Sequence, residues 1–378
     1  MAARRIRVGV IFGGKSGEHD VSITSAHAIL NNIDQTRFEP VPIGITRDGA
    51  WVTGGDPLKQ LAATSRLPLP EYSGGTERPG SSTGSDLVGQ TQSQSVRDSS
   101  DTTWVQDLDI VFPVLHGPMG EDGTVQGMLE LAGIPYVGSA VLGSAVSMDK
   151  ITAKRLCEAS GIPIVPWIGT NRRDWERDPD SVSRHIEAEI GYPCFVKPSN
   201  MGSSVGVYKV HDTDELPHAM HGAGAHDRRL LIEQAIDARE LEVSVLGNDD
   251  PISSIVGEVV PGHEFYDYEA KYVDDSSELF IPASISPEVS DEVRRIAVEV
   301  FKLLDCAGLA RVDCFLERET GRVYLNEVNT IPGFTPISMY PKLWEATGIP
   351  FSELVSRLIE LAIDRHEQNQ GTHGPYSG

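Results

Sequence analysis

The sequence has few cysteines, too little positive charge to balance its acids and no long apolar run, and each shortage removes a class of protein. Its four cysteines show no CxxC spacing and lie in apolar stretches, which favours buried free thiols in a reducing compartment over a disulfide or zinc framework. With 32 Lys and Arg against 55 Asp and Glu, the formal net charge is −23, which disfavours nucleic acid and anionic membranes as partners. No apolar run could span a bilayer, and the basic N-terminus lacks a secretion-signal pattern. We therefore expect a cytoplasmic protein.

Two common nucleotide-binding signatures are also missing. The loop Gly13–Gly17 (GGKSG) is neither GxGxxG nor a complete Walker A motif, so it is weak evidence for a dinucleotide site. It does lie between a β-branched run, Arg7–Phe12, and a helix predicted from about Ser22 to Ile33. A strand, a glycine-rich turn and a helix in this order are typical of a doubly wound parallel-sheet domain, which binds ligands at the carboxyl ends of its strands.

The remaining pattern is that of an α/β (α+β) protein with two or three domains, as 378 residues allow. Further strands are predicted at Phe38–Thr46, Leu108–Leu115, Cys194–Lys197, Leu230–Gln234 and Glu240–Leu246, the last as an edge or half-buried strand. Further helices are predicted at Thr124–Leu131, Val141–Ser160 and Pro287–Asp305, with two more before a tail that loses its pattern after about His366.

One segment, Gly54 to Thr103, breaks this pattern. Its later part consists mainly of Gly, Ser, Thr and Gln with few aliphatic residues. Such a composition cannot bury enough apolar surface to offset the entropy lost on ordering. We predict a flexible surface insertion that carries no chemistry.

The most informative stretch is Gly308 to Thr330, which predicts a β-hairpin. Leu309–Leu316 alternates, Glu319–Gly321 supplies turn residues, and Val323–Val328 returns. With the loop centred on Thr320, the pairs on one face are Asp313 with Glu327 and Arg311 with Asn329. The pairs on the other face are Val312 with Val328, Leu316 with Tyr324 and, less core-like, Cys314 with Asn326.

The polar face of this hairpin suits a cation. Asp313 and Glu327 would stand roughly 5 Å apart and repel each other. A metal ion between them would remove that cost, with Asn329 as a third oxygen ligand, and few hard oxygen ligands suit Mg²⁺. The alternative is a solvated hairpin face on which Arg311 neutralises a carboxylate.

Other polar side chains lie where strands end or helices begin. Glu18 either favours the dipole of the first helix or holds a substrate ammonium. His116 follows a buried strand and is either a site residue or a capping or core histidine. Lys197 precedes Pro198–Gly206, a turn that either binds an anion or is a plain flexible hairpin. Glu233 is expected at the polar edge of its strand.

Taken together, these stretches resemble the ATP-grasp enzymes of the D-alanine–D-alanine ligase family. The resemblance rests on VGVIFGGKSGEHDVS, VFPVLHGPMGEDGTVQG, SMDK, FVKPSNMGSSVGV, LIEQAIDARELEVSVL, YEAKY, ARVDCF and LNEVNTIPGFTPISM. Each motif is modest alone, whereas their order and spacing are highly specific. Only Gly54–Thr103 and the last dozen or so residues depart from the family pattern.

The resemblance implies an ATP-grasp fold with three domains. Residues 1–138 would form the N-terminal substrate domain, with the insertion at about 54–103. Residues 139–232 and 233–366 would form central and C-terminal domains that clamp ATP between antiparallel sheets, and 367–378 a disordered tail. The family also implies two Mg²⁺ or Mn²⁺ ions per site and a homodimer.

It further implies roles for single residues. The ATP-binding residues would be Lys150, Lys197, Ser204, Glu233, Ile236, Glu240 and Lys271, and the metal ligands Asp313, Glu327 and Asn329. The catalytic residues would be Glu18, Ser203, Tyr272 and Arg311, and the substrate-binding residues His116, Gly333, Ser338 and Met339. Glu18 would hold the first ammonium and be hydrogen-bonded to Ser203 and Tyr272.

The implied reaction joins two D-alanine molecules through a D-alanyl phosphate, for peptidoglycan precursors. The YEAKY form of the loop, Tyr268–Tyr272, goes with D-alanine as the second substrate, while relatives that use D-lactate usually lack the last Tyr. The alternatives are a D-alanine–D-lactate ligase, another ATP-grasp ligase such as a carboxylase-type enzyme, a non-catalytic nucleotide-binding regulator, and a nicotinamide oxidoreductase, which would need the missing GxGxxG motif.

Overall fold

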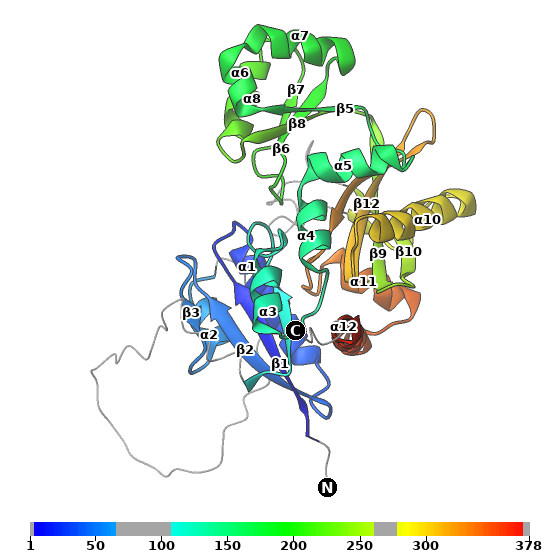
Figure 1. Ribbon diagram of the computed structural model, residues 1–378. Helices are drawn as coiled ribbons and strands as arrows, with labels where there is room; N and C mark the ends of the chain where they lie inside the picture. The colour runs from blue at the N-terminus through cyan, green and yellow to red at the C-terminus, as the bar shows by residue number, and fades with distance from the viewer. Residues whose placement is uncertain (1–3, 66–106, 261–277, 373–378) are drawn as a thin grey trace.

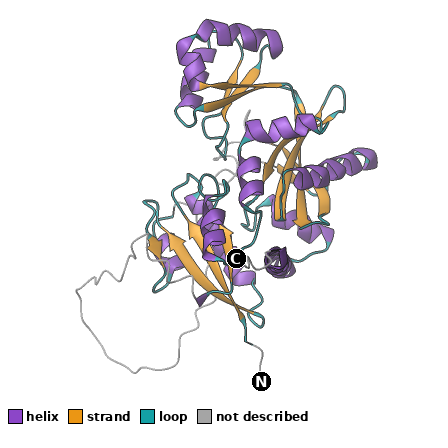
Figure 2. Ribbon diagram, in the orientation of Figure 1, coloured by secondary structure: helices purple, strands orange, loops and turns teal. Residues whose placement is uncertain are grey.

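Three β-sheets with their helices make up the molecule (Figures 1 and 2). The structure, a computed structural model, describes residues 4–65, 107–260 and 278–372. Residues 261–277, which include YEAKY, most of the predicted insertion and the last residues lie outside this described part. The α/β fold class predicted from the sequence is confirmed.

The N-terminal sheet is doubly wound, as the strand–turn–helix pattern predicts. Its strand order is β3-β2-β1-β4, in which β1, β2 and β4 are parallel and β3 is antiparallel to β2. The strands are β1 (Ile6–Gly13), β2 (Phe38–Ile45), β3 (Trp51–Val52) and β4 (Ile110–Val114). The helices are α1 (His19–Asn32), α2 (Pro57–Ala62) and α3 (Thr124–Ala132). Alternate residues of β1 face the two cores on either side of the sheet.

Two of these helices differ from the prediction. Helix α1 begins at His19, three residues before the expected start, because the backbone N–H of Ser22 already bonds to the carbonyl of Glu18. Helix α2 lies inside the segment predicted to be a flexible insertion. That prediction is wrong for 57–62, since Asp56 caps the helix and Leu58 and Leu61 are buried.

The second sheet is antiparallel, with strand order β5-β8-β6-β7. Its strands are β5 (Trp167–Asn171), β6 (Cys194–Pro198), β7 (Tyr208–Val210) and β8 (Arg229–Gln234). Its helices are α6 (Arg172–Arg177), α7 (Pro179–Glu189) and α8 (Leu216–Gly224). This unit buries an apolar core of its own, to which Ile186 and Val196 belong.

The third sheet is also antiparallel, with strand order β11-β10-β9-β12-β13. Its strands are β9 (Ala238–Gly247), β10 (Ile252–Val260), β11 (Glu278–Phe280), β12 (Gly308–Glu317) and β13 (Val323–Asn329). Its helices are α10 (Pro287–Leu303), α11 (Met339–Thr347) and α12 (Phe351–Thr372). The expectation that β9 is an edge strand is wrong, because β9 pairs with β10 on one side and β12 on the other.

The single helix predicted from Val141 to Ser160 is two helices, α4 (Val141–Met148) and α5 (Lys150–Ala159). The break is at Asp149, whose backbone is extended and whose side chain accepts a hydrogen bond from the N–H of Thr152 at 2.8 Å. The apolar periodicity continues across Asp149 and so does not reveal the break. The local signal is the Asp itself, because Asp is a favoured residue at the start of a helix.

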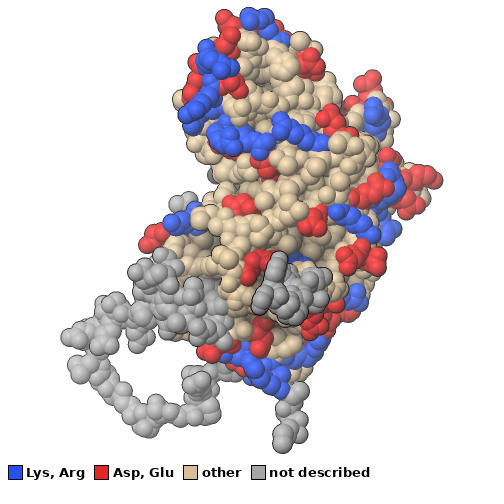
Figure 3. Space-filling model, in the orientation of Figure 1, with Lys and Arg blue, Asp and Glu red and all other residues tan. Residues whose placement is uncertain are grey.

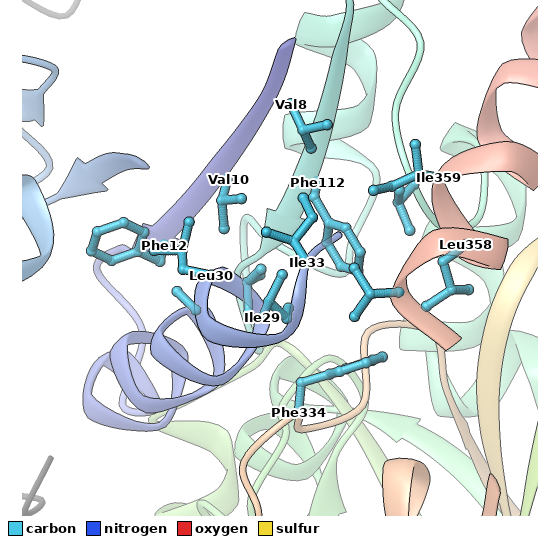
Figure 4. Close-up of a cluster of buried hydrophobic side chains, with 14 of the residues drawn as sticks. Val8, Val10, Phe12, Ile29, Leu30, Ile33, Phe112, Phe334, Leu358 and Ile359 are labelled. Carbon is cyan, nitrogen blue, oxygen red and sulfur yellow. The ribbon is translucent and has the colours of Figure 1, made fainter. Parts of the chain in front are cut away.

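The N-terminal domain and the C-terminal helix share one core (Figure 4). In the close-up, Leu358 and Ile359 of α12 face Phe112 of β4, while Ile29 and Ile33 come from α1. Helix α12 continues to Thr372, further than the sequence pattern indicated.

Acidic and basic side chains are unevenly spread over the surface. In the space-filling view, blue Lys and Arg atoms gather along one edge of the unit that carries α6 to α8 (Figure 3). Elsewhere on this face red and blue mix. The net charge of −23 therefore leaves room for locally basic surfaces.

Candidate functional site

A cleft of about 480 Å³ lies between the two antiparallel sheets. Its volume falls within the range of ordinary ligand pockets. Nine residues predicted from the sequence line it: Lys150, Lys197, Ser203, Ser204, Glu233, Ile236, Glu240, Asp313 and Glu327. The predicted Lys271 and Tyr272 lie outside the described residues.

The hairpin prediction is confirmed from Arg311 to Asp313, including the apolar pair of Val312 with Val328, and is wrong from Cys314 onward. Asp313 pairs with Glu327, as the loop centre implied. Cys314, however, pairs with Leu325 rather than with Asn326, because a β-bulge shifts the register by one residue.

The pair expected between Leu316 and Tyr324 is shifted in the same way, and Leu316 lies opposite Val323. Asn326 and Glu327 are consecutive polar residues, and both are half-buried in the structure. They interrupt the period of two, but the alternation alone does not say which residue forms the bulge. The apolar side chains on either side of the bulge still reach the core.

The polar face of the hairpin holds a network of charged side chains. Arg311 donates two hydrogen bonds to Asp313, from Nε at 2.7 Å and from the guanidinium at 2.8 Å. Its Nε also lies 3.0 Å from the buried carboxylate of Glu242 on β9. Asn329 donates its amide to Asp313 at 3.0 Å. Two carboxylates therefore lie against the Arg311 guanidinium, the Asn329 amide binds one of them, and Glu327 is paired with Asp313 across the strands.

Glu327 has its own cation, since Nζ of Lys150 lies 3.3 Å from its carboxylate. Within the described residues, no group of three His, Cys, Asp or Glu side chains has the arrangement of a metal site. The sequence proposal used two carboxylates and an amide, so it does not depend on such a group. As the structure stands, Arg311 neutralises Asp313, which is the alternative raised from the sequence.

Glu233 lies at the other end of the cleft and is buried, not at a polar edge as predicted. Its two carboxylate oxygens each lie 2.5 Å from a lysine, Oε1 from Lys154 and Oε2 from Lys197. Burial alone would raise the pKa of Glu233, but the two lysines outweigh it and lower the pKa to about 2. A lone carboxylate is usually solvated at the surface, whereas the Glu233 carboxylate is stabilised inside the protein by the two lysines.

The turn after β6 has two consecutive non-glycine residues in the left-handed region. Ser203 and Ser204 have positive φ angles of 49° and 57°, which non-glycine residues rarely adopt. Lys150 donates from Nζ to the carbonyl of Met201 at 2.8 Å, so the turn is held from the start of α5. Strained backbone of this kind clusters at ligand sites.

Glu18 connects the N-terminal domain to this turn. The hydroxyl of Ser203 donates a hydrogen bond to the Glu18 carboxylate, as the family resemblance implied. A side chain on Gly117 or Gly202 would come within 3.2 or 3.3 Å of the same carboxylate. These two glycines let both loops approach Glu18 closely.

His116 fits the interpretation as a core histidine. It is only 4% exposed, its Nδ1 lies 2.8 Å from the carbonyl of Ile331, and its Nε2 lies 3.3 Å from the hydroxyl of Ser25. Burial lowers the pKa of His116, the Glu18 carboxylate raises it less, and the neutral ring is favoured.

Of the three predicted substrate residues near the C-terminus, Gly333 and Ser338 lie between β13 and α11, and Met339 is the first residue of α11. The Ser338 hydroxyl is 2.7 Å from that of Thr335, and Ser338 stands directly before the helix. The Met339 side chain is buried against Leu343, which leaves its backbone as the part that could bind a substrate. Gly333 is buried in the same turn.

Sequence reasoning missed Lys154, which pairs with Glu233, and Glu242, which lines the cleft. Lys154 lies four residues after Lys150 and so on the same face of its helix. Glu242 lies two residues after Glu240 on the same face of β9, which alternation could have shown.

No helix within the described ranges is both long enough and apolar enough to cross a membrane.

Comparison with known proteins gives matches over nearly the whole chain. The family model described as D-ala D-ala ligase N-terminus matches residues 7–139, and D-ala D-ala ligase C-terminus matches 156–360. The D-alanine–D-alanine ligase of Acetivibrio thermocellus is 48% identical over 371 residues, covering 96% of this chain and 97% of its own. That of Geobacillus thermodenitrificans is 46% identical over 376 residues, covering 97% of this chain and 98% of its own.

Solved structures agree. The D-alanine–D-alanine ligase from Coxiella burnetii has a TM-score of 0.77 at 35% identity, covering 98% of this chain and 97% of its own. The VanG D-Ala:D-Ser ligase from Enterococcus faecalis has a TM-score of 0.76 at 34% identity, covering 95% of this chain and all of its own.

Proposed function

The chain belongs to the D-alanine–D-alanine ligase family, and we propose that it joins its two substrates in the cleft between the antiparallel sheets. It is a ligase that makes D-alanyl-D-alanine, a peptidoglycan precursor, at the expense of ATP. The alternative classes weighed from the sequence are not favoured. The roles of single residues are our proposal.

The observation that carries the site assignment is the hydrogen bond between Ser203 and Glu18. It joins the loop that borders the nucleotide cleft to the first helix of the substrate domain. A carboxylate at this point can hold the ammonium of the first D-alanine beside the phosphates. Such a contact across two loops is what an enzyme needs to bring a carboxylate substrate within reach of ATP.

ATP would lie along the cleft, with its base near Glu233 and Ile236 and its ribose near Glu240. Lys150 and Lys197 would neutralise the phosphates, and Ser204 would bind them in the turn after β6. Each of these residues lines the cleft. In phosphoryl transfer the protein acts mainly by positioning and by neutralising charge.

In the first step, an oxygen of the D-alanine carboxylate attacks the γ-phosphorus of ATP, the bond to the bridging oxygen breaks, and ADP leaves. In the second step, the amine of the other D-alanine attacks the carbonyl of the acyl phosphate. Arg311 would stabilise the oxyanion that forms, phosphate leaves, and the amine loses its proton. Gly333, Ser338 and Met339 would bind the carboxylate of the second D-alanine through backbone N–H groups and a hydroxyl.

The donor set on the hairpin fits Mg²⁺ or Mn²⁺. Asp313, Glu327 and Asn329 offer hard oxygens on one face of the sheet, and few protein ligands leave positions for phosphate oxygens and water. Bound there, the metal would neutralise the polyphosphate. We propose that these three residues hold two ions. For that, Asn329 must turn its amide oxygen inward and Arg311 must release part of Asp313.

Three further proposals concern the whole protein. The bounds 1–138, 139–232 and 233–366 are proposed for the three domains, although the boundary between the second and third falls inside β8 of the second sheet. A homodimer is proposed from the family and is tested by light scattering on the eluted protein. A cytoplasmic location stays a prediction from the cysteine pattern.

The test of the function is phosphate release from ATP with D-alanine, D-serine or D-lactate as the added substrate. D-Alanine alone should stimulate release and yield the dipeptide on chromatography. In a mixture, the amine should win over the hydroxyl of D-lactate near neutral pH. Main products that contain D-serine or D-lactate would overturn the assignment of the second substrate.

A further inference from the structure

The segment Ile331–Phe334 follows the hairpin of β12 and β13 in sequence but packs against the N-terminal domain and is hydrogen-bonded to it. The ring of Phe334 packs edge-on against Phe112 of β4, with 6.0 Å between ring centroids. It belongs to the same core as α1 and α12, and in Figure 4 it points toward that cluster. The turn that leads to Ser338 therefore takes its position from a different domain than the strand before it.

Three side chains of the N-terminal domain bind the backbone of this segment. Glu121 accepts the N–H of Ile331 on Oε1 at 3.1 Å, and His116 donates from Nδ1 to the Ile331 carbonyl at 2.8 Å. The hydroxyl of Ser25 accepts the N–H of Phe334 at 3.1 Å. We call Glu121, His116 and Ser25 the bracket.

The hydrogen-bond directions within the bracket are fixed by chemistry. A carbonyl only accepts, so Nδ1 of His116 carries the ring proton and Nε2 is an acceptor. The Ser25 hydroxyl then donates to Nε2 while it accepts from Phe334. Both polar backbone groups of Ile331 and one of Phe334 are thus satisfied by side chains from another domain.

Glu121 is the carboxylic acid of the bracket and reaches two loops. Its second oxygen, Oε2, accepts the N–H of Gly117 at 2.7 Å, beside Glu18. The side chain is buried, at 9% exposure of the residue. Its neighbour Asp122 also accepts two backbone N–H groups, those of Met119 and Thr124, but both lie in its own loop.

The protonation state of Glu121 sets the conditions for a test. Burial and, less strongly, the charge of Glu18 raise the pKa of Glu121 to about 8, while the two backbone N–H groups oppose this shift. Only the carboxylate offers an acceptor to both N–H groups without competition from its own proton. The kinetic comparisons below are therefore made at about pH 9, where the carboxylate predominates.

We propose that Glu121 is a positioning residue for the second D-alanine, which acts by holding the Ile331–Phe334 turn against the substrate domain. The proposal rests on the assignment of Gly333, Ser338 and Met339 to that subsite. Under this proposal, the bracket fixes the position of the second amino-acid subsite relative to the first. Glu121 itself touches neither substrate.

The Glu121→Gln variant tests this connection. A carboxamide has one acceptor oxygen, so it can accept from Gly117 or from Ile331 but not from both, and its NH₂ opposes the remaining N–H. The loss of one hydrogen bond to a charged acceptor corresponds to roughly a tenfold change in binding. We expect the apparent KM for the second D-alanine to rise about tenfold.

A trapping assay separates the two subsites. Hydroxylamine intercepts the acyl phosphate as D-alanine hydroxamate, and it has no carboxylate for the second subsite to bind. In Glu121→Gln, the rate of hydroxamate formation should change less than about threefold. Dipeptide formation should fall, as the roughly tenfold rise in the KM for the second D-alanine predicts. Equal losses in both assays would overturn the proposal, because Glu121 would then act at the first subsite or on the fold as a whole.

Two companion variants complete the experiment. Ser25→Ala removes the contact with Phe334 but leaves Gly117 untouched, so it should raise the same KM even if Glu121→Gln does not fold. Asp122→Asn is the matched control and should leave both assays unchanged. Unchanged kinetics in Ser25→Ala and Glu121→Gln would refute the bracket. Absence of D-alanine-dependent phosphate release from the unmodified protein would instead refute the proposed function.

Discussion

At the scale of single residues, the cleft sets several carboxylates against basic side chains. Glu233 lies between Lys154 and Lys197, and Glu327 faces Lys150. These pairs hold charge inside the protein that would otherwise carry a high desolvation cost. Under the proposed function, Lys150 and Lys197 would exchange these carboxylates for the phosphates of ATP.

Glu327→Gln should lose dipeptide synthesis by roughly two orders of magnitude or more, as when other groups that stabilise transferring charge are removed. The free energy of unfolding without metal should change by less than about 1 kcal/mol, since the pair with Lys150 is partly exposed. Steady-state rates across a magnesium titration, together with urea unfolding, check both values.

The control for this variant is Glu319→Gln, an exposed change in the turn of the same hairpin. It should retain full activity. A Glu327→Gln protein with normal turnover at low magnesium would show that the hairpin face is not a metal site.

His116 predicts a pH dependence of stability. Burial lowers its pKa below the value of 6.5 expected in the unfolded chain. Below pH 6.5 His116 therefore binds a proton in the unfolded state but stays neutral in the folded state until a lower pH. The free energy of unfolding decreases as the pH falls. The surrounding groups are Ser25, the Ile331 carbonyl, Glu18 and Arg311, of which only Glu18 raises the pKa by its charge.

The measurement is the free energy of unfolding in urea at pH 7.5 and at pH 5.5. Between these values the unmodified protein should lose about 1 kcal/mol more than His116→Asn, which has no group that titrates there. Asn also leaves a void, so its stability is lower at both values, and only the difference in slope is diagnostic. Parallel pH profiles would contradict the prediction.

At the scale of elements, the break between α4 and α5 positions Lys150 and the turn after β6, which we propose bind the nucleotide. Asp149 caps α5 and also accepts a hydrogen bond from Asn200 at 3.0 Å and one from Arg229. The N–H of Lys150 bonds to the carbonyl of Ser199 at 3.1 Å. One carboxylate therefore starts the helix and holds the turn after β6 against it.

Asp149→Ala should lower the free energy of unfolding by about 2 kcal/mol, at the upper end for a helix cap. It should also raise the KM for ATP several-fold, because Lys150 and the turn lose their common support. Asp178→Ala is the control: Asp178 caps α7 in the same way, accepting from Ser181 at 3.0 Å, but lies away from the cleft. It should cost about 1 kcal/mol and leave the KM unchanged. Equal KM values in the two variants would refute the role assigned to Asp149.

At the scale of the whole molecule, the cores divide the chain unevenly. One core joins the N-terminal sheet to α12 and includes Leu246 of β9 and Leu309 of β12. The unit with β5 to β8 keeps a separate core. The N-terminal and C-terminal domains should therefore unfold together, while the unit with β5 to β8 can open on its own.

Two buried truncations test this division by hydrogen exchange. Leu358→Ala, in the shared core, should cost roughly 2–5 kcal/mol and speed exchange in both β1 and β12. Ile186→Ala, equally buried, should cost a similar amount but speed exchange only in β5, β6 and β8. Acceleration of all three sheets by both variants would show a single cooperative unit.

The sequence by itself determined the fold class and the hairpin with Asp313 opposite Glu327, and its motifs resembled the family to which the chain belongs. The fold class and the hairpin follow from local rules: side chains alternate in strands, and glycine-rich turns follow buried strands at ligand sites. Motifs in a fixed order also carry long-range information that no single motif holds. For this reason the order of residues along the chain is enough to identify nine of the residues that line the cleft.

Only the tertiary structure decided how those residues are paired. The bulge at Asn326, the central place of β9 and the burial of Glu233 each depend on a neighbour distant in sequence. The bracket on Ile331 spans 210 residues from Glu121. A backbone hydrogen bond leaves no trace in the pattern of side chains, because every residue except proline offers the same N–H and carbonyl. The hydrogen bonds that join the segment Ile331–Phe334 to the N-terminal domain are therefore visible only in the folded chain.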